Sequence, residues 1–411
     1  MNRAKNPFID DSIVSKGDYC PRKEVEEKIL KKLESGHNLA LIGDRRIGKT
    51  STAHHVIDGM KGYYKVDIDL YHITEPSDIA ESIIDACMKV LSHVWDGKKV
   101  LDLASRLTPK FDITESGVSF GVGTKGQEYK KTLNVAFEFL NETVKRTKGK
   151  VVILFDEFQA IKEVENGEAI LKYMRGKIQK ITRIPFMYVG SIRHEMDHIF
   201  RDQSSPFFKQ AEIIYFEHIE ADIFYKFIST RFKKKKIILE QDAYDYLYQI
   251  CYGVTGDIQT FCRVAFDSLP EGTHLNIEAF FVVLEIIYKN EQKYFKNILD
   301  GKELTKVQKN LIVQLAGAQE QNDIKFFGKA FQKTIGVKSP GAVTNALNAL
   351  EKKEYIYKPN GQYYFANPFF KEWILDYRYL IQATAGNLTA GSPIANTRIG
   401  FGYRQRLISG S

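Results

Sequence analysis

The stretch "LALIGDRRIGKTS", from Leu39 to Ser51, limits the fold of this chain more than any other part of its sequence. Four apolar residues lead into the spacing G-x-x-x-x-G-K-T between Gly43 and Thr50. In this motif a strand ends in a glycine-rich loop whose backbone N–H groups surround the phosphates of a nucleotide, and a helix follows. The residues after Thr50 show a helical pattern. The stretch therefore predicts an α/β nucleotide-binding fold.

The motif also assigns roles to single residues. Lys49 is expected to contact the outer phosphates, and Thr50 is expected to bind Mg²⁺. The remaining loop positions, expected to contact the nucleotide mainly through their backbone, are Gly43, Asp44, Arg45, Arg46, Ile47, Gly48 and Ser51. The guanine-reading sequence N-K-x-D does not occur in the chain, which favours ATP over GTP.

A second segment, "VVILFDEFQAI", predicts the acidic side of the same site. Residues 151–155 are apolar without interruption, as in a central parallel strand that is buried on both faces. Asp156 and Glu157 follow at the carboxyl end of this strand, which we expect to neighbour the strand of the glycine-rich loop. Asp156 is then a candidate for the Mg²⁺ shell, and Glu157 is a candidate for orienting the attacking water. Alternatively, Glu157 is an acidic residue that begins a helix.

Three further candidates follow the next predicted strand, residues 186–190. Ser191 and Arg193 lie at its tip, where a polar group can sense the γ-phosphate. Arg201 comes after a short helix and is a candidate for reaching a nucleotide bound by a neighbouring subunit. Each of these residues also fits a plain loop or surface role.

Further strands are predicted at 63–70 and 213–216. The alternation of all these strands with helices predicts a three-layer, mostly parallel sheet.

Composition separates the two ends of the chain. The 411 residues are too many for one core and indicate two or three domains. The net charge of +8 belongs entirely to residues 302–411, which hold 15 Lys and Arg against 7 Asp and Glu.

The four cysteines show neither paired nor zinc-ligand spacing and are expected to be buried thiols. The strongest apolar run, residues 279–288, is about half a membrane span, so we expect a cytoplasmic protein without membrane contact.

The basic C-terminal part has the pattern of a winged helix-turn-helix. Three helical patterns after Leu304 are followed by two short alternating runs around Asn360-Gly361, a strong hairpin signal. A helix capped by Ser339 would place Asn345 and Asn348 outward to contact base edges and Lys352 to contact phosphate, and Lys358 lies in the wing. This module is a candidate for binding double-stranded DNA, although winged helices also bind proteins.

Taken together, several segments resemble the archaeal-type P-loop ATPases, a group at the border of the AAA+ and STAND classes that is related to origin-recognition ATPases. The segments are "NPFIDDSIVSKGDYCPRKEVEEKI", "GDRRIGKTS", "FDEFQ", "VGS" and "SSPFFKQAEII", in this order. The resemblance implies an ATPase core, a helical lid and a winged helix, with Tyr19, Pro21 and Arg22 near the adenine. It matches Ser191 to the sensor after the fourth strand and Arg193 to an arginine that STAND proteins place there.

The resulting division of the chain has five parts: an N-terminal segment with an adenine-side helix (1–36), the P-loop α/β domain (37–217), a helical lid (218–300), the winged helix (301–380) and a tail (381–411) that is disordered unless it docks. The segment 112–126 alternates like a hairpin and interrupts the α/β pattern.

Two departures from the relatives concern the lid. Gln259 stands where origin-recognition ATPases carry an arginine, and Thr255 stands where STAND proteins carry a proline. We therefore predict a slow ATP-hydrolysing switch, whose nucleotide state controls assembly into a homo-oligomer or nucleotide-dependent dimer and DNA binding. The alternative is a STAND-like scaffold whose winged helix binds protein.

Overall fold

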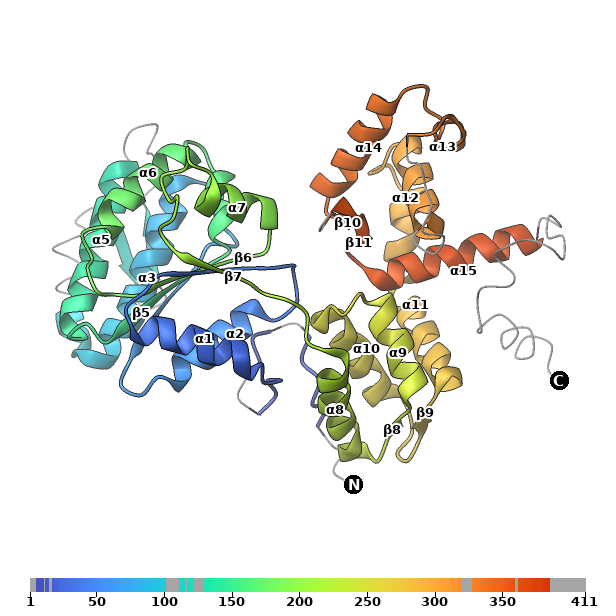
Figure 1. Ribbon diagram of the computed structural model, residues 1–411, viewed down its shortest axis with the longest axis horizontal. Coiled ribbons are helices and arrows are strands. Elements are labelled where there is room, and N and C mark those ends of the chain that lie inside the picture. Colours follow the sequence, from blue (N-terminus) through green and yellow to red (C-terminus); the bar gives the residue numbers. More distant parts are fainter. Residues whose placement is uncertain are drawn as a thin grey trace. The chain divides into compact units, whose positions relative to one another are not determined.

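The computed structural model describes residues 5–10, 12–14, 17–100, 111–114, 117–120, 129–318, 327–358 and 361–384. The chain forms two compact units (Figure 1). One is Ile13–His218, and the other combines Met1–Ser12 with Ile219–Ser411. The N-terminal segment predicted at 1–36 is thus shared between the units, and most of the predicted tail, from 385 onward, lies outside the described residues.

The first unit contains a parallel sheet in the order β2-β5-β6-β1-β7. Its strands are β1 (Leu39–Ile42), β2 (Tyr64–Asp69), β5 (Val151–Asp156), β6 (Phe186–Gly190) and β7 (Glu212–Tyr215). The expectation that β5 neighbours the loop strand β1 is wrong, because β6 lies between them. All five residues of β6 are buried, which suits this central position. Ser191, directly after β6, is therefore placed between the glycine-rich loop and the acidic pair.

Alternate residues of the strands point to two different cores. Leu39 and Leu41 pack with α1 (Lys23–Glu34) and α2 (Lys49–Gly59). Ala40 and Ile42 belong to the core on the opposite face. The helices of that face are α3 (Pro76–Val94), α5 (Tyr129–Arg146), α6 (Gly167–Ile178) and α7 (Arg193–Arg201). The predicted three-layer α/β architecture is confirmed.

Two smaller elements complete this unit. The 3₁₀ helix η1 (Phe158–Lys162) begins directly after Glu157. The strands β3 (Phe111–Thr114) and β4 (Gly117–Phe120) pair antiparallel. The hairpin expected at 112–126 is therefore present in its described part, and the rest of that segment lies outside the described residues.

In the second unit, the residues after Ile219 first form a group of helices, for which the name lid is kept. Its helices are α8 (Ala221–Phe232), α9 (Gln241–Ile250), α10 (Thr255–Ser268) and α11 (Ile277–Asp300), with a 3₁₀ turn η2 (Lys233–Lys235). The expectation of helices alone is incomplete, because β8 (Ile238–Leu239) and β9 (His274–Leu275) form a short parallel pair. The core of the lid is rich in aromatic residues, and Phe261 and Phe280 stack with centroids 4.5 Å apart.

The winged helix follows in the same unit. Its elements are α12 (Lys306–Ala318), α13 (Lys329–Ile335), α14 (Pro340–Lys352), the antiparallel pair β10 (Ile356–Tyr357) and β11 (Tyr364–Phe365), and α15 (Pro368–Thr384). Ser339 caps α14 as predicted, since its side chain accepts from the backbone N–H of Ala342 at 3.3 Å. Asn360 of the predicted turn lies outside the described residues.

Lid and winged helix share one core. The 24-residue helix α11 ends at Asp300, and near this end Phe295 contacts Phe370 and Trp373 of α15, with centroids 5.2 and 5.6 Å apart. Tyr252 of the lid meets Tyr364 of the hairpin with centroids 4.6 Å apart. A fragment that begins at residue 301 would lack part of this core, so experiments on the winged helix need the full chain.

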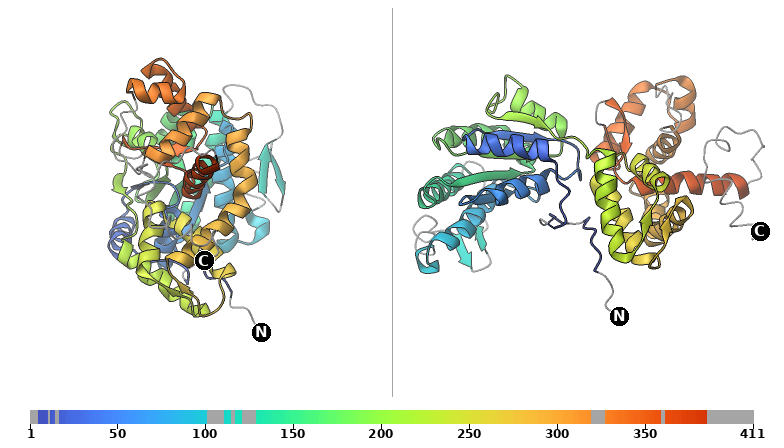
Figure 2. Two further views of the ribbon diagram at one scale, coloured as in Figure 1. Left: turned by 90° about the vertical axis from the view of Figure 1, so that its right-hand side faces the viewer. Right: turned by 60° about the horizontal axis from the view of Figure 1, so that its bottom comes forward.

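The N-terminal residues pack on the lid (Figure 2, dark blue beside α8). Phe8 is 3% exposed and contacts Phe232 and Phe266, with centroids 4.7 and 6.1 Å apart. The Nε atom of Arg263 donates to both carboxylate oxygens of Asp10, at 2.9 and 3.0 Å. The side chain of Gln259 accepts from the backbone N–H of Ile9 at 3.4 Å. Gln259 thus helps to hold the N-terminal segment.

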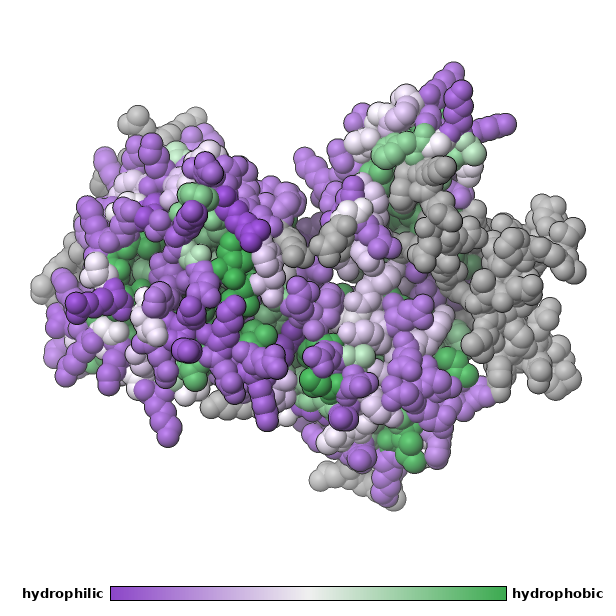
Figure 3. All heavy atoms as spheres, viewed as in Figure 1, coloured by the Kyte–Doolittle hydropathy of each residue, from purple (hydrophilic) through white to green (hydrophobic). Residues whose placement is uncertain are grey.

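The cysteines are buried, and the surface is mainly hydrophilic. Cys20, Cys87, Cys251 and Cys262 are all buried and free, as expected. Figure 3 shows hydrophilic side chains spread over the visible face, with apolar residues in smaller separate patches. None of the helices in the described part of the chain combines the length and apolarity that a membrane span requires.

Candidate nucleotide-binding site

The glycine-rich loop has a backbone shape that depends on its glycines. A Cβ atom at Gly43 would lie 2.5 Å from the carbonyl oxygen of Phe216 and 2.9 Å from Cδ1 of Ile47, so only glycine fits there. Gly48 has φ +94°, in the left-handed region that glycine adopts at no steric cost. It directly precedes α2, so the loop ends at a helix N-terminus, which attracts anions.

Lys49 lies inside this loop. Its side chain is buried, and its ammonium donates to the carbonyl oxygen of Asp44 at 2.5 Å. Burial lowers the pKa of Lys49 to about 8, although the negative charges of Glu157, Asp156 and Asp44 oppose this shift. Asp44 and Ile47 lie in the loop and Ser51 lies in the first turn of α2, and their roles as backbone contacts stay predictions. Arg45 and Arg46 are exposed at the rim of the loop.

Thr50 and Asp156 meet as the magnesium prediction requires. The Thr50 hydroxyl, in the first turn of α2, donates to Oδ2 of Asp156 at 2.8 Å, although β6 lies between β5, which ends at Asp156, and β1, which leads into the loop. Burial raises the pKa of Asp156 to about 6, and the charges of Glu157 and Asp69 act in the same direction. A hydroxyl beside a half-buried carboxylate fits Mg²⁺, which binds one or two protein oxygens together with phosphates and water. No group of three or more His, Cys, Asp or Glu in the described residues forms a larger metal cage.

Glu157 is held in place by two side chains. Its backbone has φ 51° and ψ 45°, a left-handed conformation that costs a non-glycine residue on the order of 1–3 kcal/mol. Ser191 donates its hydroxyl hydrogen to Oε2 of Glu157 at 2.7 Å, and the amide of Gln159 donates to the same oxygen. Such strain is typical of functional sites. The structure therefore brings Glu157 and Ser191, two candidates from the sequence, into direct contact.

The two candidate arginines lie on α7. Arg193 is the first residue of this helix, and its side chain lies outside what the structure describes. Arg201 is the last residue, with a side chain that is 61% exposed. Its guanidinium carbon lies 5.2 Å from the ring centroid of Tyr215, and its Nε lies 3.9 Å from Oδ1 of Asp197. Arg201 is thus an exposed side chain at the end of α7.

The residues that the resemblance places near the adenine contact the loop and α2. The Tyr19 hydroxyl lies 2.9 Å from Oγ1 of Thr52, and its ring stacks on His55 with centroids 4.1 Å apart. Arg22 lies over the ring of Phe216 at 4.2 Å and donates to the carbonyl oxygen of Ile47. Arg22 thereby ties the loop to the end of β7.

Pro21 is exposed. It directly precedes Arg22 in the chain, and no side-chain contact is seen for it among the described residues. The position of Pro21 near the adenine remains a prediction from the resemblance.

Comparison with solved structures identifies the fold. The Walker-type ATPase PabY2304 of Pyrococcus abyssi matches with a TM-score of 0.59 and 15% identity, covering 90% of this chain and 99% of that one. The ORC2 protein of Aeropyrum pernix, solved in ADPNP and ADP complexes, matches with a TM-score of 0.51 and 11% identity, covering 93% and 99%. The chain has the fold of archaeal Walker-type ATPases. No curated protein matches its sequence.

A family model described as "Probable winged helix domain" matches residues 292–376 of this chain. The match begins within α11, in agreement with the shared core of lid and winged helix. On α14, Val343, Ala346, Leu347 and Leu350 are buried, and the predicted DNA contacts Asn345, Asn348 and Lys352 are exposed. Lys358 is also exposed, with its ammonium 4.6 Å from the ring centroid of Tyr363.

Sequence reasoning missed several members of the site. Asp69 ends β2 directly beside Asp156 in the sheet, and its position at the end of a predicted strand was a usable signal. Gln159 lies two residues after Glu157 and is 3% exposed. Its Oε1 atom is buried without a hydrogen-bond partner among the described residues, close to where a Cβ at Gly190 would lie. Nothing in the sequence around Gln159 distinguishes it from an ordinary helix residue.

The two shifted pKa values predict how nucleotide binding depends on pH. Below about pH 6 Asp156 is protonated, which would remove its attraction for a bound Mg²⁺, and above about pH 8 the Lys49 of the free protein loses its charge. The affinity for MgATP should therefore be highest between these values and decrease about tenfold per pH unit on the acid side. Titration calorimetry between pH 5 and pH 9 measures this profile. Asp156→Asn should remove the acid limb, and an unchanged acid limb in this variant would refute the assignment.

Proposed function

We propose that this chain is a Mg²⁺-dependent ATPase that hydrolyses ATP slowly and acts as a molecular switch. The observation that carries the proposal is the contact between Thr50 and Asp156 beside the buried ammonium of Lys49. These three groups supply the hydroxyl, carboxylate and cation that a bound MgATP requires. The nucleotide complexes of ORC2, a protein with the same fold, support ATP as the ligand.

Each residue of the proposed site has a separate task. The loop from Gly43 to Gly48 encloses the phosphates, and Lys49 neutralises charge on the outer ones. Thr50 and Asp156 hold Mg²⁺, which when bound stabilises the charge that develops on the transferred phosphoryl group. Glu157 orients the attacking water and accepts its proton, while Ser191 fixes the direction of the Glu157 carboxylate.

The residues at two positions of the lid favour slow ATP hydrolysis over the fast turnover of a motor protein. Gln259 contacts the N-terminal segment, and Thr255 begins α10 where STAND relatives carry a proline. Neither residue offers a positive charge to the nucleotide. Turnover then depends on the sheet unit, and the lid with its winged helix responds to the nucleotide through the two chain connections between the units.

The winged helix is proposed to bind double-stranded DNA with low sequence specificity. Lys352 and Lys358 are exposed, and residues 302–411 carry a net charge of +8. Fluorescence anisotropy of the full chain with random duplex should show binding that weakens with salt, with a slope of about one unit per phosphate contact. Lys352→Glu should weaken binding and reduce this slope. Lys145→Glu on α5 is the control: it reverses an exposed charge on the other unit and should have no effect on duplex binding.

A protein partner is the second candidate for the winged helix. The hairpin side chain Tyr364 already contacts Tyr252 of the lid, so part of the wing is engaged within the unit. Lys352 also has an acidic neighbour in Glu351. Absence of duplex binding at low salt, or binding that is indifferent to salt and to Lys352→Glu, would favour this candidate over DNA.

ATP is further proposed to favour a homodimer or larger homo-oligomer. Arg201 is exposed and only loosely paired, so a neighbouring nucleotide can compete for its guanidinium. Light scattering should give a larger mass with an ATP analogue than with ADP or no nucleotide, and Arg201→Ala should lower turnover. Arg146→Ala, which removes a half-exposed arginine of α5, is the control. An unchanged mass in all three states would contradict the proposal.

A further inference from the structure

Two segments control the position of the Glu157 carboxylate. The first is η1, which begins at the residue after Glu157. The second is α7, which begins two residues after Ser191, the donor to Oε2 of Glu157. A relative shift of these two segments would change the Ser191–Glu157 hydrogen bond. What fixes η1 against α7 therefore also fixes the geometry of the site.

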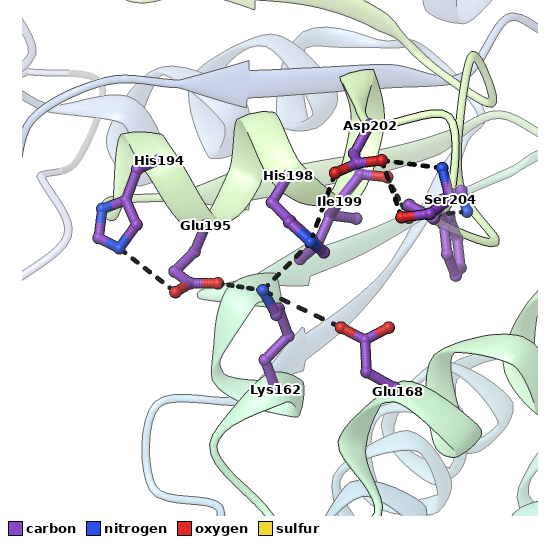
Figure 4. A network of polar contacts seen from close by, with 10 residues as sticks. Lys162, Glu168, His194, Glu195, His198, Ile199, Asp202 and Ser204 are labelled. Carbon is purple, nitrogen blue, oxygen red and sulfur yellow. Dashed lines mark hydrogen bonds and ion pairs between the residues drawn. The ribbon is translucent and has the colours of Figure 1, made fainter.

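Lys162 connects these segments at the end of η1 (Figure 4). Its ammonium forms an ion pair with Glu195 of α7 and lies 3.3 Å from Nδ1 of His198, one turn further along the same helix. It also lies 4.0 Å from Oε1 of Glu168 on α6. The ammonium of Lys162 thus connects η1 to two helices, α6 and α7.

This ion pair differs from the exposed pairs of the chain. The side chain of Lys162 is 18% exposed and that of Glu195 is 31% exposed. Burial acts to raise the pKa of Glu195, but the hydrogen bond and charge of Lys162 outweigh burial and lower it. The pair is therefore formed in the folded protein at neutral pH.

An apolar contact also joins η1 and α7, and it stabilises their packing without fixing a direction. Phe158 of η1 is fully buried and contacts Phe200 of α7 with centroids 5.9 Å apart. Such a contact stabilises the packing, but it permits small sliding because it has no directional partner. An ion pair at the rim contributes little to the free energy of unfolding and adds a defined direction. Its loss should therefore affect geometry more than stability.

We propose that Lys162 is a positioning residue for ATP hydrolysis, which holds α7 against η1 and thereby keeps Ser191 hydrogen-bonded to Glu157. The inference rests on the proposed ATPase activity. Removal of the Lys162 charge should lower kcat about tenfold, because displacements well below 1 Å are costly at a catalytic centre. The affinity for MgATP should stay the same, since the glycine-rich loop and Thr50 lie on other elements.

The test compares Lys162→Met with Lys162→Arg in the full chain. We expect about tenfold lower kcat with unchanged affinity for a MgATP analogue in Lys162→Met, and recovery in Lys162→Arg, which keeps the ion pair. Combining Lys162→Met with Ser191→Ala should cost no more than Ser191→Ala alone, because both act through one hydrogen bond. Lys236→Met breaks the exposed pair with Glu271 and serves as the control.

A second readout does not depend on turnover. Amide hydrogen exchange in the nucleotide-free protein should increase in residues 157–162 and 191–198 of Lys162→Met, and not in Lys236→Met. Normal kcat in Lys162→Met, additive effects with Ser191→Ala, or unchanged exchange would overturn the inference alone. Absence of hydrolysis in the wild-type protein would instead overturn the proposed function, and the inference with it.

Discussion

Lys49→Ala is expected to abolish measurable ATP binding. The substitution removes a buried ammonium that faces the outer phosphates, and loss of one partner from a desolvated charge pair costs about 3 kcal/mol or more, which is ~100-fold in affinity. Titration calorimetry with MgATP measures the effect directly. Thermal unfolding of the variant should show a folded protein, because the same substitution also removes the cost of burying a charge.

The matched control is Lys65→Ala. The side chain of Lys65 is 17% exposed, and its ammonium lies 3.0 Å from Asp58, so it is a comparably enclosed lysine of the same unit. It lies on β2 and has no place in the proposed phosphate site. Equal loss of affinity in both variants would point to general destabilisation, and normal ATP binding by Lys49→Ala would remove the glycine-rich loop from the account.

Glu157→Gln is expected to keep nucleotide binding and to lose hydrolysis. The amide has nearly the same shape and can still contact Ser191, but it cannot accept a proton from the attacking water. A positioned general base typically contributes about 100-fold or more to the rate. Phosphate release at saturating MgATP measures kcat, and calorimetry measures the affinity.

Glu163→Gln provides the control for this prediction. Glu163 is exposed and follows η1 only six residues after Glu157, so its substitution changes the local charge equally. Normal turnover in Glu163→Gln together with a large loss in Glu157→Gln would assign the role to one carboxylate. Equal turnover in the wild type and Glu157→Gln would refute the assignment.

The core of the site was predictable because it depends on local sequence. The spacing from Gly43 to Thr50 requires a strand, a loop and a helix in that order, and uninterrupted apolar residues mark β5 as buried. Asp156 and Glu157 follow from the end of that strand. These features need no knowledge of distant contacts.

Other features depend on contacts that local patterns do not record. The insertion of β6 between β1 and β5 is a matter of sheet order, which the alternation of strands and helices leaves open. The ion pair of Lys162 with Glu195 joins residues 33 positions apart, and neither residue stands out from the surrounding charges. The packing of Phe8 on the lid joins the start of the chain to residues more than 200 positions later.

We propose that the site formed by Lys49, Asp156 and Glu157 hydrolyses MgATP. The most direct measurement is phosphate release in a single-turnover experiment, with the purified full chain in excess over ATP. We expect slow, complete release that requires Mg²⁺ and is absent in Glu157→Gln. ATP that binds but stays intact over many hours in the wild-type protein, or release that continues without Mg²⁺, would contradict it.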